Sequence, residues 1–248
     1  MPFREKRILS GEILEVEVYP ISKDEIRKPR SKRMKETRKE QKRLNKENAK
    51  KHFKRLIYAN FSNKAIVVTL TYEKLIKPKN EINVTKDFQN FVRRLKYILK
   101  KETGDDLKYL SVIEDGEDGK NYHIHAILEC VSGILELKKV EKTWGKGFTN
   151  MNRLRTHPDD VEGLAEYFLE NPKGKKKWMQ SKGLVIPEPK VNDTKYRSRK
   201  DIRELSNAVF DREEIEKRYP GYEYIRGNSE TNLIYGGDYI TILMRRRC

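Results

Sequence analysis

The bulky apolar residues of this sequence are grouped in short runs, which are separated by polar segments. Residues 65–72 (AIVVTLTY) are β-branched and apolar, which predicts a central strand buried on both faces. Residues 107–114 (LKYLSVIE) and 121–129 (NYHIHAILE) predict two further strands. The segment 115–120 between them is rich in Gly and Asp, which favour turns. Together these segments predict a β-hairpin.

Two segments show the spacing of amphipathic helices. In residues 85–101 the apolar positions recur every three or four residues, so one face should pack on a core. Residues 159–170 show the same pattern more briefly, and Asn171-Pro172 should end that helix. Tyr167 lies about 100° from the centre of the apolar stripe, at the edge of the buried face.

The two ends of the chain are patterned more weakly. Residues 13–18 predict a short strand that Pro20 ends. Residues 28–58 hold fourteen Lys and Arg against three Glu, and they predict a long helix that is docked on the core only by its last turns. A merely solvated charged helix is the plain alternative, but the one-sided charge favours contact with a polyanion. Towards the C-terminus we expect a helix near 200–218 and a hairpin that turns at 236–238.

Composition narrows the class of partner. The formal net charge is +17 over 248 residues, which favours nucleic acid first and an anionic membrane surface second. No apolar run is long enough to cross a bilayer or to form a signal peptide, so we expect a cytoplasmic protein. The two cysteines, Cys130 and Cys248, have no zinc-binding or disulfide spacing. No phosphate-binding loop of the G-x-x-x-x-G-K-[ST] type occurs, which excludes an ATPase of that class.

The candidate chemistry centres on His123-Ile124-His125. Residues two apart on a strand project from the same face, so both imidazoles should point at one place. Glu114 ends the preceding strand and can lie across the hairpin from either histidine, depending on the length of the turn. Two nitrogens and one carboxylate suit Mg²⁺ or Mn²⁺ with open positions for a substrate oxygen. A His-x-His pair by itself is more often structural.

Three ordered motifs give these residues a context. AIVVTLTY, HIHAIL and LAEYFLENPKGKKKW, followed by SKGLVIPEP, resemble the three motifs of rolling-circle replication initiators of plasmids and phages. These initiators are members of the HUH (His, hydrophobic, His) endonuclease superfamily. The resemblance extends over about residues 45–190. It implies an α+β fold with a central, mainly antiparallel sheet and helices packed on it. We expect a basic N-terminal helical arm (1–58), the catalytic domain (59–190) and a small α+β C-terminal extension (191–248).

The resemblance also implies roles for individual residues. His123, His125 and Glu114 would hold the metal, and Tyr167 would be the nucleophile that forms a 5′-phosphotyrosine link. The side chains expected to contact DNA are Lys173, Lys175, Lys176, Trp178 and Arg94, although a structural role suits Trp178 equally well. The substrate would be single-stranded or melted origin DNA. Because the chain has no ATPase motif, a separate helicase would unwind the origin, and the host polymerase would extend the freed 3′-OH.

One residue departs from the pattern, and two alternatives stay open. Many relatives have Tyr-x-x-Lys in the third motif, whereas this chain has Glu170 at that place. The first alternative is a nonenzymatic protein that binds single-stranded nucleic acid, since the RNA-recognition fold has a similar architecture. The second is a single-tyrosine transposase of the same superfamily.

Overall fold

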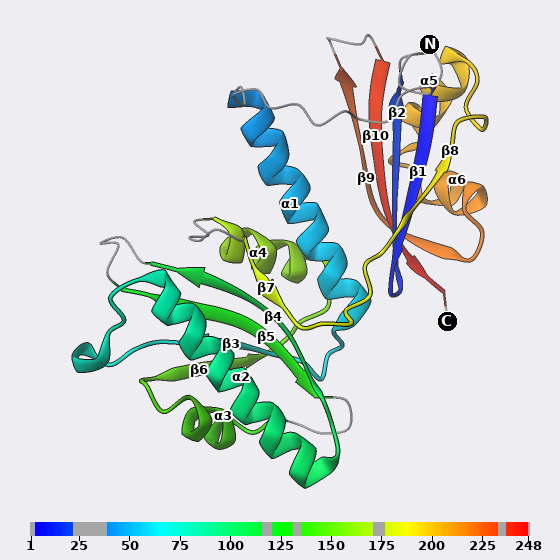
Figure 1. Ribbon diagram of the computed structural model, residues 1–248. Coiled ribbons are helices and arrows are strands. Elements are labelled where there is room, and N and C mark those ends of the chain that lie inside the picture. The colour runs from blue at the N-terminus through cyan, green and yellow to red at the C-terminus, as the bar shows by residue number, and fades with distance from the viewer. Residues whose placement is uncertain are drawn as a thin grey trace. The chain divides into compact units, whose positions relative to one another are not determined.

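A computed structural model describes residues 3–21, 39–115, 121–130, 135–170, 177–232 and 237–247. The chain forms two compact units, which are described separately below. One is Asn45–Val185, and the other combines Met1–Leu44 with Ile186–Cys248. Each unit contains a five-stranded antiparallel sheet with helices, which confirms the predicted α+β class (Figure 1).

The sheet of the unit 45–185 has the strand order β6-β3-β5-β4-β7. Its strands are β3 (Ile66–Leu70), β4 (Leu107–Glu114), β5 (His123–Cys130), β6 (Thr149–Arg153) and β7 (Met179–Gln180). The predicted hairpin is confirmed, because β4 and β5 pair from Leu107↔Cys130 to Glu114↔His123. The strand with the two histidines is therefore central, with β3 on one side and β4 on the other.

Two helices cover one face of this sheet. They are α2 (Glu81–Thr103) and α3 (Leu137–Trp144), of which the sequence predicts only the first. Ile124, Ala126 and Leu128 of β5 are buried with the apolar stripe of α2 and with Trp144. Burying a large apolar side chain contributes about 1.5–3 kcal/mol, so this cluster is the principal support of the sheet.

Two other helices pack on the opposite face. They are α1 (Lys39–Asn60) and α4 (Pro158–Leu169). Ile127 of β5 lies in their cluster with Phe53 and Phe168. The last turns of α1 thus dock on the core as predicted. Residues 28–38 of the predicted basic helix lie outside the described residues.

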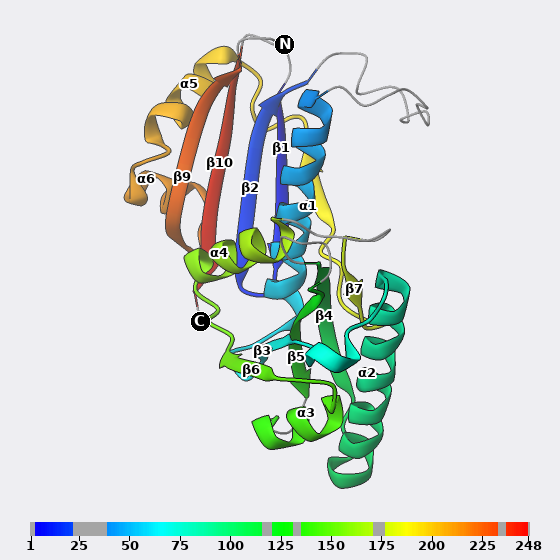
Figure 2. The same ribbon diagram turned by 90° about the vertical axis from the view of Figure 1, so that its left-hand side faces the viewer.

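The second unit is built around the sheet β8-β1-β2-β10-β9. Its strands are β1 (Phe3–Ser10), β2 (Ile13–Pro20), β8 (Pro189–Asn192), β9 (Tyr222–Asn232) and β10 (Gly237–Arg246). The helices α5 (Arg199–Ala208) and α6 (Arg212–Arg218) cover one face of it (Figure 2). The predicted C-terminal hairpin is present as β9 and β10, but the turn predicted at 236–238 is misplaced, because Gly237 and Asp238 already pair with Asn232 and Thr231. Its first strand also begins earlier than the sequence indicates.

The strand pairing joins the two ends of the chain. β1 pairs with β8, and β2 pairs with β10, so the N-terminal strands belong to the same sheet as the C-terminal extension. The helix predicted near 200–218 is two helices, because Asp211 accepts a hydrogen bond from the Glu214 amide and caps a new helix start. The predicted bounds of the catalytic domain, 59–190, stay a prediction. The compact unit in the structure comprises residues 45–185.

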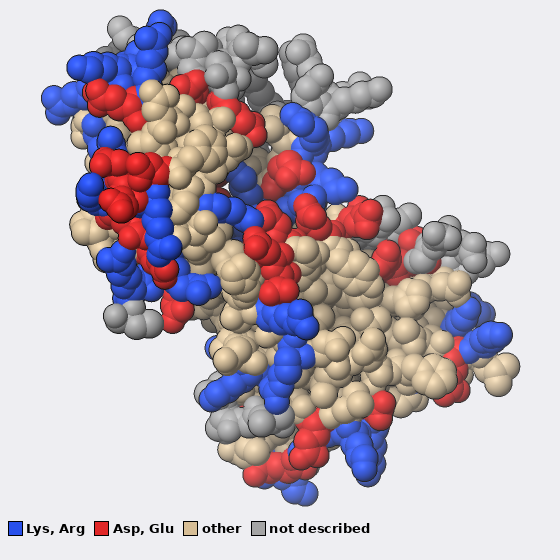
Figure 3. All heavy atoms as spheres, turned by 180° about the vertical axis from the view of Figure 1, so that it is seen from behind, with Lys and Arg blue, Asp and Glu red and all other residues tan. Residues whose placement is uncertain are grey.

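Helices α5 and α6 of the second unit carry charges of both signs. Figure 3 shows acidic and basic side chains interspersed where α5 and α6 face the viewer. Arg212 pairs with Glu216, and Lys217 pairs with Glu214. A face of mixed sign is a poor site for a polyanion. Among the helices of the described residues, none has the length and apolar character needed to cross a membrane.

Candidate active site

The register of the hairpin places Glu114 beside the two histidines. Glu114 lies directly opposite His123, and Val112 lies opposite His125. His123 and His125 project from the same face as Ile127, the face on which α1 and α4 pack. The sequence leaves this parity open, and the structure brings the carboxylate and both imidazoles to one face of the sheet.

His125 is held at both ring nitrogens. Its Nδ1 lies 3.1 Å from Thr69 Oγ1, and its Nε2 lies 3.1 Å from Glu114 Oε2. The side chain is almost wholly buried, and this burial lowers the pKa of His125 although the Glu114 carboxylate opposes the shift. A neutral imidazole is the form that binds a metal ion. Because a threonine hydroxyl both donates and accepts, Thr69 can serve either tautomer of the ring.

His123 stands apart from this pair. Its ring centroid is 6.5 Å from that of His125, and the two rings are close to parallel. Within the described ranges, no three His, Cys, Asp or Glu side chains are close enough to form a ligand group. The convergent pair is therefore His125 and Glu114. Because His123 is on the same face, its ring can approach them through side-chain torsions alone.

Tyr167 lies on α4 beside His125. The helix begins at Pro158, whose fixed φ suits a first turn, and Asp159 and Asp160 complement the helix dipole there. The ring of Tyr167 meets that of His125 edge to face, with centroids 4.9 Å apart. The residue is nevertheless 54% exposed, so α4 and the sheet leave much of Tyr167 open to solvent. Partial burial, and then the charge of Glu114, raise the pKa of Tyr167.

Helix α1 fixes the position of α4 through a series of polar contacts, which we call the α1–α4 ladder. Its rungs recur every four residues along both helices, and their reversed order shows that the helices are antiparallel. The contacts are Lys46 Nζ to Glu170 O (3.2 Å), Lys50 Nζ to Glu166 Oε1 (3.6 Å), Lys54 Nζ to Glu162 Oε1 (2.7 Å) and Tyr58 Oη to Pro158 O (3.3 Å). Together with the buried face of α4, which includes Val161, Ala165 and Phe168, the ladder sets how α4 lies on the sheet and therefore the direction of Tyr167.

The residues predicted to contact DNA lie in different places. Lys173, Lys175 and Lys176 fall outside the described residues. Trp178 packs edge-on against Phe53, and its indole donates to Gln180 Oε1, a packing that matches the structural alternative.

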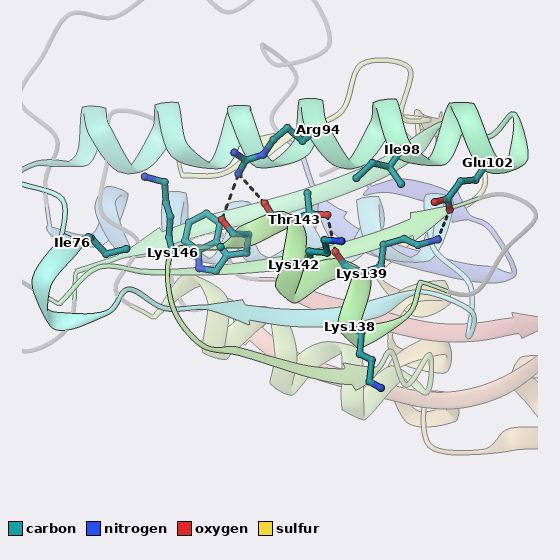
Figure 4. Close-up of a pocket in the computed structure, with 11 residues that line it drawn as sticks. Ile76, Arg94, Ile98, Glu102, Lys138, Lys139, Lys142, Thr143 and Lys146 are labelled. Carbon is teal, nitrogen blue, oxygen red and sulfur yellow. Dashed lines mark hydrogen bonds and ion pairs between the residues drawn. The ribbon is translucent and has the colours of Figure 1, made fainter.

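Arg94 lies on the other face of the sheet. It donates hydrogen bonds of 2.8 Å and 3.4 Å to the carbonyl oxygens of Thr143 and Trp144 at the end of α3 (Figure 4). The surrounding pocket of about 740 Å³ is also lined by lysines 138, 139, 142 and 146. Arg94 is therefore separated from the histidines by the sheet, and its contacts cap α3.

Two threonines and an aromatic residue near the histidines are missed or undervalued from the sequence. The pattern of residues 65–72 predicts only a buried strand, yet the hydroxyl of Thr69 in that strand lies 3.1 Å from Nδ1 of His125. The available signal is a hydroxyl inside an otherwise apolar buried strand. Phe148 lines a pocket with Thr71 and His123, and no local pattern marks it.

Comparison with known proteins gives a family for this region. Residues 65–172 match the family described as replication-associated protein ORF2/G2P. No curated protein matches the chain, and no solved structure does. The matched segment begins just before β3 and ends just after α4, so it contains His123, His125, Glu114 and Tyr167. This match over residues 65–172 bears out the resemblance to replication-associated proteins for the part of the chain that holds the candidate site.

Proposed function

We propose that this replication-associated protein nicks and rejoins single-stranded origin DNA through Tyr167, as in rolling-circle replication. The observation that carries the proposal is the edge-to-face contact of Tyr167 with His125, whose Nε2 is 3.1 Å from Glu114. An exposed phenol beside a neutral imidazole and a carboxylate suits phosphoryl transfer, and the family match supports a role in replication.

The donor set suits one divalent ion, Mg²⁺ or Mn²⁺. His125 and Glu114 would hold it together with a reoriented His123, because imidazole nitrogen and carboxylate oxygen are ligands for such ions. When bound, the ion supplies Lewis-acid stabilisation of charge on the scissile phosphate. The raised pKa of Tyr167 fits a site that needs such a cation, since the phenol stays protonated without one.

The reaction balances without another reactant. Tyr167 Oη forms a bond to phosphorus, and the bond from phosphorus to the 3′-oxygen breaks. The phenol loses its proton, and the leaving oxygen gains one to give a free 3′-OH. Because the 5′-phosphotyrosine is itself a phosphodiester, a later 3′-OH can reverse the step and rejoin the strand. A separate helicase and the host polymerase would then carry out unwinding and extension.

The decisive experiment looks for the covalent link. Labelled single-stranded oligonucleotides that tile the DNA flanking the gene are incubated with the full chain and Mn²⁺, and a denaturing gel reveals an adduct. Tyr167→Phe should abolish it. Tyr97→Phe is the matched control, because Tyr97 is exposed on α2, which packs on the opposite face of the sheet.

The outcomes separate the proposal from its alternatives. An adduct that persists in Tyr167→Phe assigns the nucleophile to another residue. Binding of the oligonucleotides with no adduct from any sequence favours the nonenzymatic binding protein. If His123→Ala and His125→Ala both retain full cleavage in the presence of a chelator, the metal assignment is wrong.

A further inference from the structure

A pocket of about 480 Å³ opens next to His123 at the edge of the candidate site. It is lined by residues 71–74, Lys77, residues 121–123 and Phe148. This volume lies within the range of small-ligand sites in proteins. The lining combines hydroxyl, amide and imidazole groups with aromatic rings, and two lysines, Lys74 and Lys77, outnumber its one carboxylate, Glu73.

Phe148 is the unusual member of this lining. Its side chain is 79% exposed, although it is large and apolar. Its backbone is held in place, because the carbonyl oxygen of Phe148 accepts hydrogen bonds from both the amide and the hydroxyl of Thr71. Both bonds have a length of 3.0 Å. Exposure of a large apolar ring to water is unfavourable, and exposed apolar surface often marks a binding site. The ring of Phe148 is therefore available to contact a ligand.

The segment before Phe148 is pinned as well. The Glu73 amide donates a hydrogen bond of 2.9 Å to the Lys146 carbonyl. The Trp144 indole donates one of 2.8 Å to the Thr71 carbonyl. Gly147 permits this close approach, because a Cβ there would meet the Thr71 carbonyl and would lie 2.8 Å from the Glu73 nitrogen. The aromatic ring therefore stands on a preformed platform rather than on a loose loop.

We propose that this pocket is a subsite for one nucleobase of the single-stranded substrate, stacked on Phe148. Every base has a π-face, and stacking on an exposed aromatic ring is a sequence-tolerant way to hold a single strand. Lys77, whose ammonium donates to Asn121 Oδ1, supplies positive charge for the adjoining phosphate. Because His123 lines the same pocket, a base held there places a neighbouring phosphate toward the histidines.

This inference rests on the proposed function, whose substrate it specifies. The test measures binding and not cleavage, so the two can fail separately. The full chain carrying Tyr167→Phe is titrated into a fluorescein-labelled oligothymidylate, and into an oligomer of equal length made only of abasic deoxyribose phosphates. Fluorescence anisotropy gives a Kd for each probe.

Adding Phe148→Ala should weaken binding of the oligothymidylate about tenfold, which corresponds to the loss of one modest base–aromatic stack. Binding of the abasic probe should not change, since that probe has no base to stack. Phe148→Trp should retain the affinity. Phe210→Ala is the matched control, because Phe210 is also exposed but belongs to the other unit.

Two results would overturn the subsite. One is a Phe148→Ala variant that binds oligothymidylate as tightly as its parent. The other is an equal loss for both probes, which would assign Phe148 to the backbone path or to local folding. Failure of the proposed function appears elsewhere, as the absence of any adduct from the chain that retains Tyr167.

Discussion

Lys46 donates a hydrogen bond from its ammonium group to the backbone carbonyl of Glu170, 3.2 Å away. Glu170 occupies the place where many relatives have a lysine, and α4 has no basic residue in its own last turn. Helix α1 therefore brings a lysine to the end of α4, one turn after Tyr167. A cation there complements the helix dipole and the charge that develops on a phenolate.

We expect Lys46→Ala to slow formation of the Tyr167 adduct several-fold and to lower the free energy of unfolding by about 0.5 kcal/mol. Lys96→Ala is the control, because Lys96 pairs with Asp106 over 2.8 Å and lies on α2, which packs on the face of the sheet opposite to Tyr167. It should cost a similar amount of stability and leave the adduct rate unchanged. Equal rates for the two variants would show that Lys46 acts only on folding.

Thr69 should matter for metal affinity more than for stability. Its hydroxyl meets Nδ1 of His125, and a ligand-orienting hydrogen bond of this kind contributes about 10- to 100-fold in metal affinity or activity. Thr69→Val keeps the shape and removes the bond. We expect it to raise the Mn²⁺ concentration that gives half of the maximal adduct, measured by titration of Mn²⁺.

Thr69→Ser tests the interpretation, since it restores the hydroxyl without the methyl group. It should return the Mn²⁺ dependence to that of the native chain. If serine and valine shift the titration equally, the packing of the methyl group, and not the hydrogen bond to His125, is what the site needs.

Elements that depend on residues close together in the sequence can be predicted from it. Pairings between distant segments cannot. The β4–β5 hairpin is predictable because a Gly- and Asp-rich turn joins two patterned strands. The charged strand β1 and the short polar strand β6 have no apolar run to mark them. The pairing of β1 with β8 joins distant parts of the chain, which local pattern does not specify.

The candidate site divides in the same way. Spacing alone places His123 and His125 on one face of a strand. Contact between Tyr167 and His125 depends on how α4 lies over the sheet, which its buried face and the α1–α4 ladder set together. The sequence of α1 contains many lysines, but nothing in the sequence distinguishes the lysines that face α4 from those that face solvent.

Glu5 in β1 predicts a pH dependence of stability. It is 1% exposed, and it accepts hydrogen bonds from Lys195 (2.6 Å), Arg7 (2.8 Å) and Tyr219 (2.8 Å). Burial alone would raise the pKa of Glu5, but these three donors outweigh it and hold the pKa below its ordinary 4.5. The folded state therefore binds this proton less readily than the unfolded chain.

The resulting stability is present above pH 4.5 and is lost as the pH falls through the folded pKa of Glu5. Glu5→Gln should lower the free energy of unfolding by about 2 kcal/mol at neutral pH, since hydrogen bonds to a charged group are lost. Urea unfolding at a series of pH values should show the native and variant curves converging in acid. A difference that stays constant with pH would refute the role of the charge.

Two glycines of the unit 45–185 should respond in opposite ways to the same substitution. At Gly147 a Cβ would meet the carbonyl of Thr71 and would lie 2.8 Å from the nitrogen of Glu73, both parts of the backbone. Gly147→Ala should therefore destabilise the unit by about 1–3 kcal/mol, the usual cost of overpacking. At Gly163 in α4 a Cβ meets nothing within 4 Å, so Gly163→Ala should stabilise the helix by up to about 1 kcal/mol.

Urea midpoints followed by circular dichroism compare the two variants directly. Gly147→Ala should also weaken binding of oligothymidylate, because the backbone shift that admits the methyl group moves the platform of Phe148. A Gly147→Ala variant with native stability and native affinity would mean that the segment yields at little cost. The close contact with Thr71 would then not be what holds the aromatic ring in place.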